Sequence, residues 1–74
     1  MDAIVLGVME SWPLQLSLAT EGGTEQVALD EGTLVTRAGR KLDPGALRPG
    51  QRVRVVIREP EGGEHVAISV EIID

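Results

Sequence analysis

Cysteine, phenylalanine and tyrosine are absent from this chain of 74 residues, and Trp12 is its only aromatic residue. Without cysteine, the chain can form no disulfide and offers no thiolate ligand to a metal. Without Phe or Tyr, its core has to be built from Val, Leu and Ile. A single core in so small a protein supplies only about 3–5 kcal/mol. We therefore expect barrel closure or self-association to add stability.

Long hydrophobic runs are also absent. The longest apolar run, from Ala3 to Met9, has seven residues, whereas a transmembrane helix needs about 20. Asp2 is the only charged residue before this run, so the basic start of a secretory signal is missing. We expect a single domain over residues 1–74, located in the cytoplasm and without a membrane partner.

Acidic and basic residues occupy different parts of the chain, whose net charge is −5. Residues 1–36 and 59–74 contain eleven acidic residues and no base, whereas residues 37–58 contain all seven bases and only Asp43 as an acid. One interpretation is a basic strand that forms ion pairs with acidic strands on both sides. The other is a basic patch that binds an anionic partner.

Alternating apolar and polar residues predict five strands, at about 3–8, 14–19, 27–36, 51–58 and 65–73. Gly7 within the first strand and Asp30, Glu31 and Gly32 within the third indicate bulges. The core is expected to contain the apolar residues of the second, fourth and fifth strands, which are Leu14, Leu16, Leu18, Val53, Val55, Ile57, Val66, Ile68, Val70 and Ile72.

Turn residues separate these strands. Hairpin turns are expected at 21–24 and 61–64, each with two glycines. Residues 38–41 form a turn or a short crossing. Asp43 is a candidate N-cap and Pro44 a first helical residue of one short helical turn, with Leu47 closing the end of a barrel. Pro49 and Gly50 have the order that a type II turn requires.

Five short strands with one helical turn before the fourth predict an all-β fold, a small five-stranded Greek-key barrel of OB-like type. An SH3-like barrel is the alternative. This fold class can hold many activities, so it does not by itself assign a function.

From Val27 to Ile73 the chain resembles a bacterial family of small OB-like β-barrel domains of unassigned function. The resemblance rests on the run from Thr33 to Thr36, on the Leu-Arg-Pro-Gly-Gln turn that begins at Leu47 and enters a basic strand, and on the strand from Val66 to Ile72. Members of that family commonly read Leu-Lys-Pro-Gly-Asp at the turn. The resemblance implies the barrel and no activity.

Catalytic and metal-binding patterns are not found. His65 and Ser69 are four residues apart on one strand, which separates them by about 13 Å, too far for a hydrogen bond. The carboxylates gather at hydrated turns, whereas a general acid or base needs a cleft of low dielectric constant. We therefore expect a chain that is not an enzyme, binds no cofactor and holds no metal.

Two binding functions remain. The first is protein–protein contact or self-association through apolar residues on outer faces, for which Val5, Val56 and Ile73 are the candidates. The second is weak binding of single-stranded nucleic acid through the basic segment, for which Arg48, Arg52, Arg54 and Arg58 are the candidates. Stacking of bases would depend on Trp12, the only aromatic side chain.

Overall fold

Six strands and one short helical turn make up the described part of the chain. The computed structural model describes residues 1–9, 14–58 and 65–73. The strands are β1 (Asp2–Met9), β2 (Gln15–Thr20), β3 (Gly23–Arg37), β4 (Arg40–Leu42), β5 (Arg52–Arg58) and β6 (Val66–Ile72), with the 3₁₀ turn η1 (Pro44–Ala46) between β4 and β5. The predicted hairpin turn at 61–64 and Trp12 lie outside the described residues.

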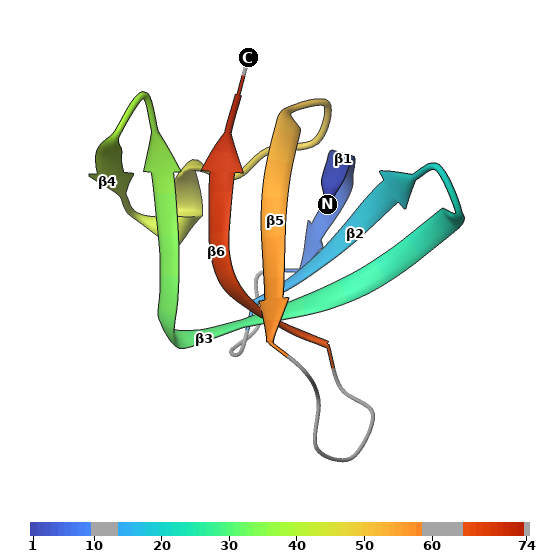
Figure 1. The fold of residues 1–74 in the computed structure, drawn as a ribbon, viewed down its shortest axis with the longest axis horizontal. Coiled ribbons are helices and arrows are strands. Elements are labelled where there is room, and N and C mark those ends of the chain that lie inside the picture. The colour runs from blue at the N-terminus through green and yellow to red at the C-terminus, as the bar shows by residue number, and fades with distance from the viewer. Residues whose placement is uncertain (10–13, 59–64, 74) are drawn as a thin grey trace.

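The strands form one mixed sheet that closes into a barrel (Figure 1). Its order is β2-β1-β5-β6-β3-β4, and an additional pairing of β2 with β3 closes the ring. The β3–β6 pair is parallel, whereas the other pairs are antiparallel. This ring order is the Greek-key arrangement of an OB-like barrel, so the predicted fold class is confirmed.

The strand count differs from the prediction because residues 40–42 form β4. Ala38 and Gly39 both have positive φ, 51° and 79°, and they connect the paired residues Arg37 and Arg40. Positive φ at both central positions is the geometry of a type I′ hairpin turn. The chain therefore folds back on β3 for three residues before η1 begins.

The turn before β5 has the expected local chemistry. The Asp43 carboxylate accepts a hydrogen bond of 2.8 Å from the Gly45 amide and caps η1, as predicted. Gly50 has a φ of 94°, and the Gln51 amide donates to the Arg48 carbonyl. The Gly50 amide also donates to the Val5 carbonyl at 2.7 Å. These bonds place the start of β5 beside β1.

The barrel interior is filled by small and aliphatic side chains. Leu47, which follows η1, is 4% exposed and belongs to this core, as expected. The other core residues come from all the ring strands and are Ala3, Val5, Leu16, Leu18, Val27, Leu29, Val35, Val53, Val55, Ala67, Val70 and Ile72. Leu14 and Ile57 are partly buried and pack against this core.

Two residues predicted for the core are not part of it. Ile68 is 49% exposed, and Val66 lies half-buried on the outer face, in register with exposed Arg58. The cause is a bulge in β6, because Val56 pairs with Ser69 whereas the next residue, Ile57, pairs with Ala67. Ile68 is the extra residue, so the alternation of faces shifts at that point.

Candidate interaction surface

Three exposed aliphatic side chains lie on neighbouring strands of the barrel's outer face. Leu34 on β3, Ile68 on β6 and Val56 on β5 are 42%, 49% and 49% exposed. Ser69 pairs with both Leu34 and Val56, so Leu34, Ser69 and Val56 form one row across three strands, and Ile68 lies next to this row as the neighbour of Ser69. Neighbouring strands are about 4.8 Å apart, which keeps the row compact. We call Leu34, Val56 and Ile68 the outer patch.

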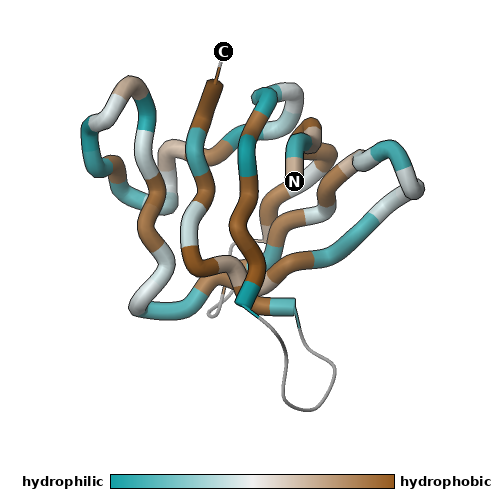
Figure 2. The backbone as a smooth tube through the Cα atoms, viewed as in Figure 1, coloured by the Kyte–Doolittle hydropathy of each residue, from teal (hydrophilic) through white to brown (hydrophobic). Residues whose placement is uncertain are grey.

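Figure 1 places the strands of the outer patch side by side, with β6 between β5 and the C-terminal half of β3. Figure 2 shows hydrophobic segments in the middle of β5 and of the C-terminal half of β3, between hydrophilic segments, whereas β6 is hydrophobic up to its C-terminal end. Soluble proteins expose single aliphatic residues commonly, but a contiguous group on adjacent strands is typical of a contact surface.

Bulges in β6 and β3 produce the outer patch. In β6, Ile68 and Ser69 together oppose the single residue Val56, so both side chains face outward. In β3, the register slips between Leu29 and Leu34. The Gly32 amide donates to the Asp30 carboxylate at 2.9 Å, and this turn closes the extra loop. The bulge predicted at Asp30, Glu31 and Gly32 is therefore confirmed.

Ion pairs border the outer patch along the strand direction. On one side Arg54 lies 3.1 Å from Asp2 and 3.9 Å from Glu71. On the other side Arg58 reaches across β6 to within 3.7 Å of Asp30. The hydrogen bond from Arg54 to Asp2, followed by the negative charges of Asp2 and Glu71, raises the pKa of the Arg54 guanidinium above its usual range. An apolar centre with a polar rim is the usual composition of a protein interface.

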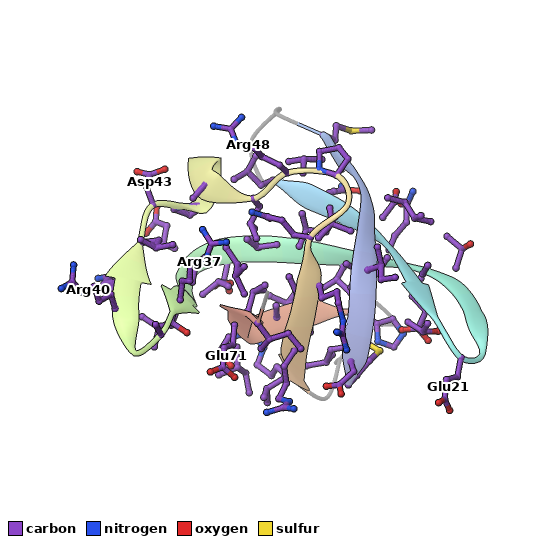
Figure 3. The ribbon with its side chains drawn as sticks, turned by 90° about the horizontal axis from the view of Figure 1, so that it is seen from above. Glu21, Arg37, Arg40, Asp43, Arg48 and Glu71 are labelled. Atoms are coloured by element: carbon purple, nitrogen blue, oxygen red, sulfur yellow. The ribbon has the colours of Figure 1, made fainter. Side chains whose placement is uncertain are left out.

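These ion pairs match the interpretation of cross-strand pairing at Arg54 and Arg58. β5 lies between β1, which supplies Asp2, and β6, which supplies Glu71. Arg52 and Arg48 make no ion pair with a described residue. Figure 3 shows Arg48 on the opposite side of the molecule from Glu71. The four candidate arginines therefore do not form one continuous basic surface.

The prediction of apolar residues on a partner surface is partly wrong. Val5 is 1% exposed and belongs to the core, because β1 turns that face inward. Outward-facing Ile4 and Leu6 are 45% and 51% exposed in its place. A register shift between Val5 and Gly7 makes Leu6 the extra residue of a bulge, as Gly7 indicated. Val56 is exposed as predicted.

Ile73 lies outside the outer patch. It is half-buried just beyond β6, and its amide donates to the Arg52 carbonyl at 3.0 Å. It lines a shallow groove together with Ile4 and Arg52. Val56 is therefore the one predicted partner-surface residue that the structure places in the outer patch.

Leu34 and Ile68 are the patch residues that sequence reasoning missed. Ile68 continues the alternation of Val66, Val70 and Ile72, so its own strand contains no sign that it faces outward. Leu34 follows the Asp30–Gly32 bulge closely, and such a bulge is the signal that the face of the next residues needs to be reassigned.

Catalytic and metal-binding geometry is not found in the parts of the chain that the structure describes. His65 is exposed just before β6, and Ser69 is half-buried on the outer face. No cluster of three or more His, Asp or Glu residues there could hold a metal ion.

A shallow groove between the β3 bulge and β4 is lined by Asp30, Glu31, Leu34 and Lys41, among others. No helix in the described residues is long and apolar enough to cross a membrane.

Comparisons with protein family models, curated proteins and solved structures found no match for this chain.

Proposed function

We propose that this chain is a non-enzymatic, cytoplasmic interaction module that makes protein–protein contacts through the outer patch. The observation that supports this most is the group of exposed aliphatic side chains at Leu34, Val56 and Ile68, on three paired strands. Covering such a group removes apolar surface from water, which drives association. The surrounding ion pairs would stay at the hydrated edge of the contact.

A second exposed apolar stripe provides a matched control. Ile4, Leu6 and Met9 follow one another along β1 and are 45%, 51% and 56% exposed. This stripe occupies one strand and begins beside Arg52, the register partner of Ile4. The outer patch extends over three strands instead, and its charges lie at its edges. We therefore assign the contact to the outer patch.

The test compares two double variants in which carboxylates replace exposed aliphatic residues. Val56→Glu with Ile68→Glu alters the outer patch, and Ile4→Glu with Leu6→Glu alters the β1 stripe. Both pairs of side chains point to solvent, so each variant should keep a dispersed amide NMR spectrum. Each immobilised chain is exposed to an extract of the source cells, and the retained proteins are quantified by mass spectrometry. Self-association of each chain is measured by sedimentation equilibrium.

We expect wild type and the β1 variant to bind the same partner, which is either another protein or a second copy of this chain. The outer-patch variant should bind that partner at least about tenfold more weakly. Loss of binding in the β1 variant instead would overturn the assignment. So would a wild-type chain that retains no protein and stays monomeric at about 1 mM, where even a weak contact is populated.

Nucleic-acid binding receives less support. Arg54 and Arg58 have carboxylate partners, Arg48 lies on the opposite side of the molecule from Glu71, and Trp12 is outside the described residues. Titration of labelled protein with mixed single-stranded oligonucleotides tests this function. Amide shifts confined to residues 48–58 that weaken with added salt would favour it over protein binding.

A further inference from the structure

The charges on the two sides of the outer patch have opposite sign. The basic side is β5, where Arg54 and Arg58 flank Val56. The acidic side is the β3 bulge, where Asp30 and exposed Glu31 precede Leu34. Among the described residues, Lys41 is the one base that lines the groove between this bulge and β4. β6 runs between the two sides and contributes Ile68 and Ser69. A surface with a basic and an acidic side about a central line is complementary to a rotated copy of itself.

We infer that the outer patch binds a second copy of this chain, as a two-fold dimer whose axis runs along β6. This inference rests on the proposed function and names its partner. The rotation places β5 of each chain over the C-terminal half of β3 of the other. Val56 then meets the partner's Leu34, and Ile68 packs near the axis. Arg58 faces the partner's bulge at Glu31.

Charge excludes the other simple arrangement. A two-fold axis across the strands would reverse their direction and bring Arg54 of one chain over Arg58 of the second, because these residues flank Val56 on β5. The axis along β6 avoids that repulsion. It brings the two Glu71 residues near each other, but each Glu71 already lies 3.9 Å from its own Arg54.

Arg58 is suited to this contact. Its side chain is 61% exposed, and its 3.7 Å approach to Asp30 is an exposed, loose ion pair. Glu31 makes no ion pair with a described residue. In the dimer, Arg58 can therefore exchange its loose contact with Asp30 for the partner's Glu31, which lies over β5. Two such contacts would be made, one on each side of the axis.

The size of the surface predicts a weak dimer. A standard interface buries about 800 Å² on each partner, which is roughly a sixth of the 4871 Å² accessible surface of this chain. Three strands of about seven residues present a face of only about 14 by 23 Å. We therefore expect a dissociation constant on the order of tens of micromolar, at the weak end of specific association.

A charge-exchange experiment tests both the dimer and its geometry. Arg58→Glu places two carboxylates together at each contact, and Glu31→Arg places two guanidinium groups together. Each variant alone should dimerise at least about tenfold more weakly than wild type. An equimolar mixture should recover association as a heterodimer. In that heterodimer the new carboxylate of one chain faces the new guanidinium of the other, and the second contact keeps the native pair of Arg58 with Glu31. Sedimentation equilibrium and native mass spectrometry measure these populations.

Arg52→Glu is the matched control, since it makes the same change on β5 in the row that pairs with Ile4, away from the outer patch. It should dimerise as wild type does, and an amide spectrum of every variant checks the fold. The dimer is overturned if wild type remains at 7.9 kDa up to about 1 mM. Its geometry is overturned if the mixture recovers nothing, or if Arg52→Glu weakens association as much as Arg58→Glu.

Failure of the dimer is distinguishable from failure of the proposed function. A monomeric wild-type chain that still captures another protein, and loses it on Val56→Glu with Ile68→Glu, leaves the interaction module standing with a different partner. A chain that neither dimerises nor captures a protein removes both proposals.

Discussion

The hydroxyl of Thr33 on β3 donates a hydrogen bond of 2.7 Å to the carbonyl oxygen of Ala67 on β6. The hydroxyl oxygen in turn accepts the Asp30 amide at 3.0 Å. Thr33 is only 9% exposed. It lies where the β3–β6 ladder is interrupted, so its side chain takes the place of a backbone partner for both groups. This contact joins the two bulges that turn Leu34 and Ile68 outward.

Thr33→Val should therefore destabilise the fold. Valine keeps the shape of threonine but leaves the Asp30 amide and the Ala67 carbonyl without their partner, which costs about 1–3 kcal/mol. Urea denaturation followed by circular dichroism measures the loss. Thr33→Ser keeps the hydroxyl and should lose less. A valine variant as stable as wild type would mean that this bond contributes little to the bulges.

Gly50→Ala should destabilise the turn that begins β5. Gly50 has a φ of 94°, where a Cβ is strained although open space surrounds it. The expected loss is about 1–2 kcal/mol. Gly7→Ala is the control, because a Cβ there meets no atom within 4 Å and its φ is not positive. Gly7→Ala should raise the free energy of unfolding by about 0.5–1 kcal/mol, because alanine suits a strand better than glycine. Equal effects at both glycines would contradict the role of φ.

Ala38→Asn should stabilise the β3–β4 hairpin. Ala38 has a φ of 51°, a conformation that costs alanine roughly 1–2 kcal/mol. Asparagine before Gly39 is the preferred pair in a type I′ turn, so a gain of about 0.5–1 kcal/mol is expected in the free energy of unfolding. Ala38→Val should change stability in the opposite direction, since a β-branched residue tolerates positive φ least. The melting temperatures of the two variants should lie on either side of that of wild type.

Leu18→Ala should unfold much of the population at 25 °C. Leu18 is 0% exposed in the core, and its truncation costs about 2–5 kcal/mol. That loss is comparable to the about 3–5 kcal/mol that a core of this size provides. Leu6→Ala, at a residue 51% exposed, should stay within about 0.5 kcal/mol of wild type. The NMR amide dispersion of the two proteins gives the comparison directly.

Much of the fold follows from local chemistry in the chain. Pro49 and Gly50 predict the turn before β5, and Asp43 with Pro44 predicts η1, because both depend on the φ preferences and side-chain acceptors of the residues themselves. The alternation in β2 and β5 likewise predicts that Leu16, Leu18, Val53 and Val55 face inward. The short β4 was missed because Ala38 is an unfavourable residue for a type I′ turn.

The candidate site could be predicted only in part. Val56 was predicted correctly because it is an apolar residue at a position of β5 that the alternation assigns to the outer face. Val5 was assigned to the wrong face because neighbouring apolar residues in β1 fit either face equally well. Ile68 was placed in the core because an unbroken alternation hides a bulge whose position depends on β3 and β5.

Strand periodicity, turn residues and composition are local properties, and they were enough to specify an all-β barrel with an aliphatic core. Which residues lie on the outside depends on how the strands pair. A bulge is stabilised by hydrogen bonds between strands, such as that from Thr33 to Ala67, and one extra residue reverses the faces of all that follow. The outer patch and the separation of its charges across β5, β6 and β3 exist only once those strands are paired.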